Sequence, residues 1–152
     1  MNIIELLMAE HAALRLHFGY LRSASFAIYE IEDFVRNCHA KIEDELVFPE
    51  LGKILEIKQA ISRLEADHKL IDVIGDQIRQ RTVQGDMETL KKRVELYASA
   101  VASHNASEES LIFGYWKGAD VILSARKIIE DFGFGRYFAI TGISEKLLDR
   151  LG

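Results

Sequence analysis

Four histidines, three of which are followed four positions later by an acid, are the residues of this chain best suited to chemistry. The histidines are His11, His39, His68 and His104, and the acids are Glu43, Asp72 and Glu108. Residues four apart lie on one face of a helix, one turn from each other. Helices that carry such pairs can direct imidazoles and carboxylates into one shared interior, as metal sites in helical bundles do. The pattern therefore predicts a metal site.

The expected turns place the four histidines at one depth. In antiparallel neighbouring helices, residues equally far from the connecting turn lie side by side. The midpoints between successive histidines fall near Ser25, just after Gly52, and at Asp86. Each midpoint lies in or beside a serine-, proline- or glycine-containing break. This coincidence indicates one layer of ligands across four helices.

Helical spacing of apolar residues dominates the chain, which contains a single proline. The pattern predicts helices over residues 2–24, 27–48, 57–83 and 87–113. Pro49 is expected to end or kink the second helix, and Asp86 is expected to cap the fourth. The predicted fold is all-α: an up-and-down four-helix bundle over residues 1–113, with an additional C-terminal helical tail over residues 114–152.

The tail, called here the C-terminal extension, needs burial because it contains apolar clusters such as Ile128-Ile129. We expect a fifth helix near residues 118–131 and an aromatic, glycine-punctuated loop over residues 132–138. Thr141 or Ser144 is expected to cap a last short helix. The extension either simply packs on the bundle, or covers the mouth of a pocket or meets a protein partner.

Composition narrows the class of protein. A length of 152 residues indicates one domain by size, and the net charge of −5 does not favour nucleic acid as a partner. The single cysteine, Cys38, excludes an internal disulfide and is expected to be a buried, inert thiol in a reducing compartment. The N-terminus does not have the pattern of a signal peptide, and no apolar stretch reaches membrane-spanning length. We therefore expect a cytoplasmic protein with no membrane partner.

The segment from His39 through Glu43 to Leu51 resembles the signature of hemerythrin-like, His-His-Glu cation-binding domains. Glu10-His11, Asp67-His68 and the run from His104 to Glu109 fall where that family places its other ligands, so the resemblance covers about residues 5–113. It implies a four-helix bundle that holds two bridged, non-haem iron ions. It further implies that the bridging carboxylates are Glu43 and Glu108, and that the terminal ligands are His11, His39, His68 and His104.

The chain departs from the oxygen-carrying hemerythrins at two positions. Those proteins have a fifth histidine where this chain has Asp72, and whether Asp72 ligates metal is left open. Their second carboxylate would correspond to Glu109, whereas the related cation-binding domains select Glu108, which helical facing also prefers. Asp67 is expected to accept a proton from a neighbouring imidazole, and His17 is expected to face away from the site.

Two other metal-site plans do not fit the sequence. Ferritin-like sites need Glu-x-x-His on two helices, but Arg36 and Val101 stand three positions before His39 and His104. A compact His-Glu-x-x-His zinc motif is absent. The first functional hypothesis is a di-iron protein that binds or reacts with a small diatomic ligand or peroxide, as a carrier or an enzyme. The alternatives are an iron or redox sensor that signals to a protein partner through the C-terminal extension, and a plain structural bundle.

Overall fold

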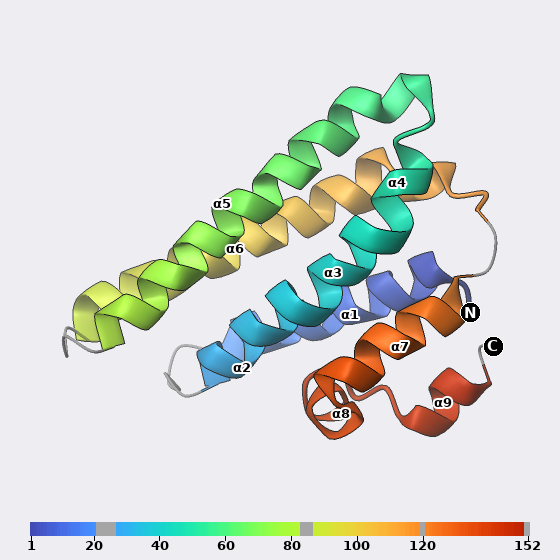
Figure 1. Cartoon of the computed structure of the whole chain (residues 1–152). Coiled ribbons are helices and arrows are strands. Elements are labelled where there is room, and N and C mark those ends of the chain that lie inside the picture. Colours follow the sequence, from blue (N-terminus) through green and yellow to red (C-terminus); the bar gives the residue numbers. More distant parts are fainter. Residues whose placement is uncertain (21–26, 83–86, 119–120, 151–152) are drawn as a thin grey trace.

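Four antiparallel helical rods form the body of the protein (Figure 1). The computed structural model describes residues 1–20, 27–82, 87–118 and 121–150. The first rod is α1 (Ile3–Tyr20), the third is α5 (Lys58–Thr82) and the fourth is α6 (Met87–Leu111). The second rod covers residues 27–51. The all-α, up-and-down four-helix bundle predicted from the sequence is confirmed.

The second rod contains two π-helical turns. It consists of α2 (Ala27–Phe34), α3 (Ala40–Ile42) and α4 (Phe48–Leu51), joined by π turns at Val35–His39 and Glu43–Val47. Pro49 was expected to end or kink this helix. It lies in the first turn of α4, so the rod continues past it to Leu51. Proline has no N–H and crowds the carbonyl four residues earlier, so a widened turn just before Pro49 is physically reasonable. The two predicted ligands of this rod belong to these π turns, since His39 ends the first and Glu43 begins the second.

The connections between the rods are only partly described. A 3₁₀ turn at Leu55–Ile57 leads into α5, and another at Phe113–Tyr115 follows α6. The break expected at Ser23 to Ser25 lies outside the described residues, as do the break at Gln84 to Asp86 and the cap predicted at Asp86.

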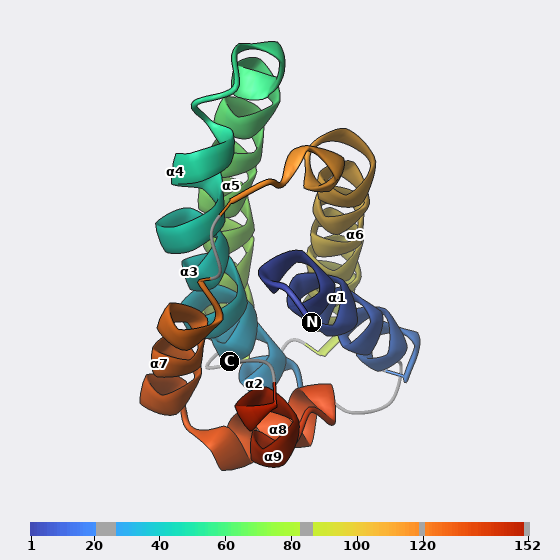
Figure 2. The ribbon, with the colours of Figure 1, turned by 90° about the vertical axis from the view of Figure 1, so that its right-hand side faces the viewer.

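The C-terminal extension packs against α1 and the second rod (Figure 2). It contains α7 (Ile122–Phe132), α8 (Phe134–Thr141) and α9 (Glu145–Asp149). The loop predicted over residues 132–138 is wrong, because only Gly133, with φ of 111°, separates α7 from α8. Glycine tolerates that positive φ, so the chain turns at one residue and the aromatic run continues as helix. Ser144 caps α9, and its side chain accepts a hydrogen bond from the N–H of Leu147.

The hydrophobic core runs without interruption from the bundle into the extension. Phe34 of α2 is fully buried, and its ring centroid lies 5.9 Å from that of Phe132 and 5.9 Å from that of Tyr137. Ile128 and Ile129 of α7 belong to the same buried cluster. The extension therefore contributes to one shared core, while its division from the bundle as a separate unit stays a prediction.

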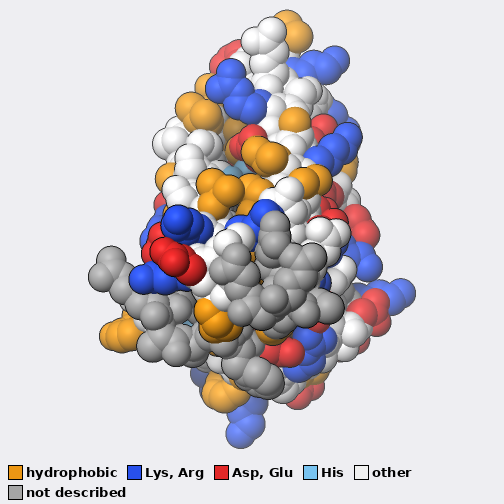
Figure 3. All heavy atoms as spheres, turned by 90° about the vertical axis from the view of Figure 1, so that its left-hand side faces the viewer, with side chains coloured by type: hydrophobic (Ala, Val, Ile, Leu, Met, Phe, Trp, Pro, Cys, Tyr) orange, Lys and Arg blue, Asp and Glu red, His pale blue; other side chains and the backbone are white. Residues whose placement is uncertain are grey.

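The surface carries charges of both signs. Figure 3 shows Lys and Arg side chains beside Asp and Glu side chains on one face, with hydrophobic side chains between them. Among the described residues, no helix is both long enough and apolar enough to cross a membrane.

Candidate metal centre

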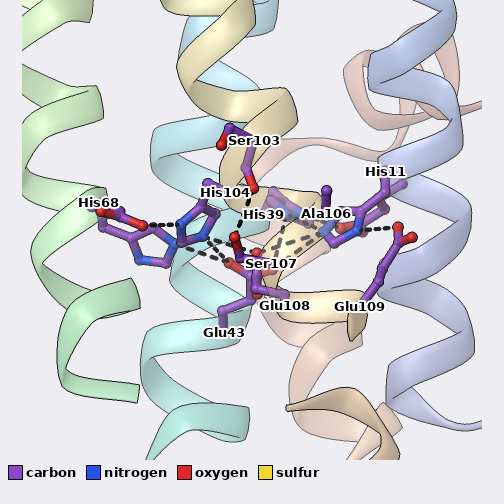
Figure 4. Close-up of polar contacts among 12 residues, drawn as sticks. His11, His39, Glu43, His68, Ser103, His104, Ala106, Ser107, Glu108 and Glu109 are labelled. Carbon is purple, nitrogen blue, oxygen red and sulfur yellow. Dashed lines mark hydrogen bonds and ion pairs between the residues drawn. The ribbon is translucent and has the colours of Figure 1, made fainter. Parts of the chain in front are cut away.

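Six of the seven predicted metal ligands meet in the interior of the bundle (Figure 4). This ligand cluster consists of His11, His39, Glu43, His68, His104 and Glu108, and all six side chains are buried. The imidazoles form two pairs joined through their Nε2 atoms. His11 Nε2 lies 3.2 Å from His39 Nε2, and His68 Nε2 lies 2.8 Å from His104 Nε2. The matched depth inferred from the turns therefore produces a single layer.

Glu43 lies between the two imidazole pairs. Its Oε1 is 3.0 Å from His39 Nε2, and its Oε2 is 3.1 Å from His68 Nε2. Glu108 occupies a similar place, since its Oε1 is 2.9 Å from His104 Nε2 and 3.8 Å from His11 Nε2. Each carboxylate therefore faces donors from both pairs.

The donors form two overlapping groups, each compact enough to hold an ion. In each group the donor atoms lie within 4.8 Å of one another. One group is His11, His39, Glu43 and Glu108; the other is Glu43, His68 and His104. Glu43 belongs to both groups. A carboxylate shared in this way is suited to bridge two cations.

The two central carboxylates also pass a chemical test for a cation. All four carboxylate oxygens of Glu43 and Glu108 are buried, and among the described residues none makes a directional hydrogen bond. A buried carboxylate without hydrogen-bond partners is strongly destabilising unless a cation compensates it. The four imidazoles direct neutral nitrogen donors at the same space, so the residues present fit a metal ion or a pair of them.

Each imidazole uses its other ring nitrogen, Nδ1, to contact a carboxylate outside the cluster. These outer carboxylates are Glu109 on His11 at 2.8 Å, Glu10 on His39 at 2.6 Å, Asp44 on His68 at 2.8 Å and Asp67 on His104 at 3.3 Å. Such contacts fix the tautomer and ring orientation of metal-binding histidines and raise their basicity. The expectation for Asp67 is confirmed.

The outer carboxylates follow a rule of sequence and space. Each one is adjacent in sequence to a member of the ligand cluster, yet each contacts the Nδ1 atom of a histidine in a neighbouring rod. Glu10 of the first rod contacts His39 of the second. Asp44 of the second rod contacts His68 of the third, and Asp67 of the third rod contacts His104 of the fourth. Glu109 of the fourth rod serves His11 of the first, which closes a ring around the bundle.

Burial and mutual charge set different ionisation states for the two central carboxylates. Burial opposes ionisation of Glu43, but the surrounding imidazoles, His39 foremost, hold its pKa well below its ordinary value. Burial and then the charge of Glu43 raise the pKa of Glu108 to about 8. Without a metal, Glu108 therefore keeps a proton at neutral pH, because two adjacent buried charges repel each other.

Three imidazoles of the metal-free cluster, those of His39, His68 and His104, have pKa values above that of free histidine. Burial lowers the pKa of His68, but its hydrogen bond to Asp44 and its close contact with the Glu43 carboxylate outweigh this and raise it to about 9. Burial likewise opposes protonation of His104, whose contacts with Glu108 and Glu43 raise its pKa to about 10. Without a metal, protons therefore supply the positive charge of the cluster.

Asp72, the seventh predicted ligand, is not brought into the ligand cluster. Its side chain is 46% exposed, and its Oδ1 lies 3.5 Å from Arg36 Nε. Arg36 also reaches the backbone carbonyl of Asp72 at 2.9 Å and the carboxylate of Asp76 at 2.8 Å. Aspartate is too short to follow the helix face inward as the longer glutamates do, and the guanidinium holds it at the surface.

Two other sequence predictions can be compared with the structure. His17 lies away from the ligand cluster, and its Nε2 contacts the backbone carbonyl of Ile140 at 2.7 Å. Cys38 is fully buried and forms no disulfide, and burial raises the pKa of its thiol, which disfavours the reactive thiolate. Both side chains behave as expected.

Sequence reasoning missed the roles of Glu10, Asp44 and Tyr137. Glu10 is fully buried and also accepts a hydrogen bond from the hydroxyl of Tyr137 at 2.6 Å. An available signal was that an acid adjoins a predicted ligand on every rod. No comparable signal marked Tyr137, which lies in the segment predicted to be a loop.

The fold and the buried histidine–carboxylate cluster together define a metal-binding helical bundle. The sequence model described as the hemerythrin HHE cation-binding domain matches residues 2–116. The chain therefore belongs to the hemerythrin HHE cation-binding family. Comparison with curated proteins gave no match, and neither did comparison with solved structures.

Proposed function

We propose that this chain is a non-haem di-iron protein whose ligand cluster binds or reacts with dioxygen, peroxide or nitric oxide. The observation that carries the proposal is the sharing of Glu43 between two groups of donors. One ion would be held by His11 and His39 and the other by His68 and His104. Glu43 would bridge them, with Glu108 as the second bridge.

The chemistry of the donors favours iron. Imidazole nitrogens and carboxylate oxygens form the cluster, while the only cysteine lies outside it. Two imidazoles with a carboxylate, together with open positions, are a common donor set for non-haem ferrous iron. Such an iron pair would supply redox chemistry toward a small ligand at an open position.

The chain's own residues would control that chemistry in three ways. The outer carboxylates orient the four imidazoles, so that every Nε2 faces inward. Phe113 stacks on the ring of His11 at 5.6 Å, and Phe48 stacks on the ring of His68 at 5.3 Å. These aromatic rings limit the access of water from the sides of the cluster. Glu108, with its raised pKa, keeps a proton in the metal-free cluster and would release it when metal binds.

Metal loading tests the proposal directly. The protein is loaded anaerobically with ferrous iron, freed of excess metal and subjected to elemental analysis, and we expect about two irons per chain. Exposure to air should then produce strong near-ultraviolet absorption, which is typical of an oxygen-bridged ferric pair. A stoichiometry near one, with zinc preferred over iron in competition, would contradict the di-iron proposal.

A second function, an iron or redox sensor acting on a protein partner, is favoured by the packing of the extension. The helix α8 contacts both α1 and α2, which carry or adjoin predicted ligands. A change at the cluster would then alter how the extension packs. Limited proteolysis tests this: a sensor should show cleavage in residues 114–150 that depends on iron or oxidation, whereas a carrier or enzyme should not.

A further inference from the structure

One outer carboxylate is held in place from the C-terminal extension. Glu10 Oε2 accepts a hydrogen bond from His39 Nδ1 at 2.6 Å, and Glu10 Oε1 accepts one from the hydroxyl of Tyr137 at 2.6 Å. All three side chains are buried, and Tyr137 belongs to α8. A continuous hydrogen-bonded chain therefore joins the extension to a member of the ligand cluster.

In its hydrogen bond with Glu10, the hydroxyl of Tyr137 is the donor and the carboxylate is the acceptor. Burial, and then the charge of Glu10, raise the pKa of Tyr137, so its hydroxyl keeps the proton at any physiological pH. Because the two oxygens of Glu10 are used by different donors, the carboxylate cannot rotate without leaving a buried polar group unsatisfied. Tyr137 thus fixes the orientation in which Glu10 meets His39.

The position of Tyr137 is itself fixed by the packing of α8. Its ring centroid lies 5.9 Å from that of Phe34, within the core shared by the bundle and the extension. One turn later in α8, the carbonyl of Ile140 contacts His17 Nε2 of α1 at 2.7 Å. The extension is therefore attached to α1 on the same side as Glu10.

We propose that Tyr137 is a positioning residue for the metal position built on His11 and His39. It acts through Glu10, so the C-terminal extension determines how firmly that position holds its ion. The inference rests on the proposed function. An imidazole whose outer N–H has a fixed acceptor is a better oriented and more basic ligand. Among the described residues, Tyr137 is the only side chain of the extension that is hydrogen-bonded to an outer carboxylate, so only the first position is adjusted from the extension.

The test compares wild-type protein with Tyr137→Phe, each loaded with cobalt(II) as a paramagnetic probe. The N–H protons of the bound imidazoles then give shifted resonances that exchange with solvent. In Tyr137→Phe, we expect one resonance to move and exchange faster while the other imidazole N–H resonances keep their positions. Anaerobic release of ferrous iron to a chelator should be about fivefold faster for one ion of the two, which is below the roughly 10–100-fold typical of an outer partner.

Two further variants identify the affected histidine and the route. Glu10→Gln should alter the same resonance more strongly, and Tyr137→Phe should add little in the Glu10→Gln background. The matched control is Tyr97→Phe, which removes the hydroxyl of another buried tyrosine, one that packs against Phe18 at 6.3 Å. This control should leave all the imidazole resonances in place.

Four results would overturn the inference. The first is an unchanged spectrum in Tyr137→Phe, and the second is an equal change in every imidazole resonance, which would indicate general loosening. The third is an effect of Tyr137→Phe that persists undiminished in Glu10→Gln. The fourth is a wild-type protein that binds no pair of ions, which would overturn the proposed function as well. If Tyr137→Phe did not fold, 3-fluorotyrosine at position 137 would strengthen the donated hydrogen bond, and slower exchange of the same resonance would be required.

Discussion

Each half of the ligand cluster contains two imidazoles, His11 with His39 and His68 with His104, but the surroundings of the two pairs differ. Around His11 and His39, the outer carboxylates Glu109 and Glu10 are 24% and 0% exposed, and a second residue holds each of them. Arg15 contacts Glu109 at 2.5 Å, and Tyr137 contacts Glu10. Around His68 and His104, the outer carboxylates Asp44 and Asp67 are 46% and 38% exposed.

This difference would make the two metal positions of the proposed pair unlike each other, although their donors are of the same kinds. In the first half, the orientation of His39 depends on a buried hydrogen bond to Glu10 that water cannot replace, and the acceptor for His11, Glu109, is only partly exposed. In the second half, water can substitute for a lost contact at an exposed carboxylate. We therefore expect the second half to exchange its ion more readily and the first half to be more sensitive to substitution.

The largest effect should come from removing what the two halves share. Glu43→Ala and Glu108→Ala should each lose most of the bound metal, because each carboxylate faces both imidazole pairs. The loss of affinity should exceed the roughly 10–100-fold typical of an outer partner. Metal per chain after gel filtration measures this, with His17→Ala as the control that retains its metal. Glu109→Ala, which removes only an outer carboxylate, should lose much less metal than Glu108→Ala. Loss of metal in Glu109→Ala but not in Glu108→Ala would move the bridge to Glu109.

A smaller effect should separate the two halves. Glu10→Gln should weaken one ion by about 10–100-fold, whereas Asp44→Asn should weaken one ion by roughly tenfold or less, because water replaces an exposed contact. Titration with ferrous iron under anaerobic conditions measures both. Equal losses in the two variants would mean that burial of the outer carboxylate does not distinguish the halves.

The pH dependence of stability should depend on whether metal is bound. In the metal-free fold, His68 and His104 have pKa values of about 9 and 10, raised from an ordinary 6.5. The stability that their protonation provides is complete below pH 6.5 and is lost as the pH rises through 9 and 10. The raised pKa of Glu108, about 8, acts with the same sign between its ordinary 4.5 and 8.

Metal binding requires these groups to lose their protons, so metal affinity should rise over the same range. The difference in Tm between loaded and metal-free protein should therefore increase from pH 6 to pH 9. Thermal unfolding followed by circular dichroism at several pH values measures it. A difference in Tm that stayed constant with pH would show that ion binding displaces no protons from the cluster.

The smallest effect is expected at Asp72. Asp72→Asn should leave the metal content unchanged, because this exposed carboxylate contacts Arg36 and not the ligand cluster. For the same reason, Asp72→His should leave the rate of oxidation in air close to that of the wild type. Elemental analysis and stopped-flow absorption measure the two quantities. Loss of one ion in Asp72→Asn would restore Asp72 as a ligand of the second half.

The sequence predicted the layer of ligands because two simple periodicities determine it. Spacing of four along a helix placed Glu43 with His39 and Glu108 with His104, and the turn positions set all four histidines at one depth. Asp72 has the same spacing from His68 but stays at the surface, since the prediction used backbone facing and ignored side-chain length. Facing alone did not reveal the competing partner, Arg36.

The parts that were not predicted depend on contacts between distant segments. The role of Glu10 toward His39 requires two rods to pack at a particular rotation, and Tyr137 is separated from Glu10 by 127 positions in the sequence. The helix α8 was missed because glycine spacing was taken as a loop signal across the whole aromatic run. In the structure, only Gly133 takes a positive φ there, and the helix resumes immediately.

The closed ring of outer carboxylates has a consequence for folding. Each imidazole is oriented by an acid from another rod, so a docked pair of neighbouring rods orients one of its two histidines and leaves the other free. Only the complete bundle orients all four. High-affinity uptake of metal should therefore be a late event, which prevents an ion from trapping a partly assembled chain. The same ring makes metal content a measure of how much of a protein sample has reached its fully assembled state.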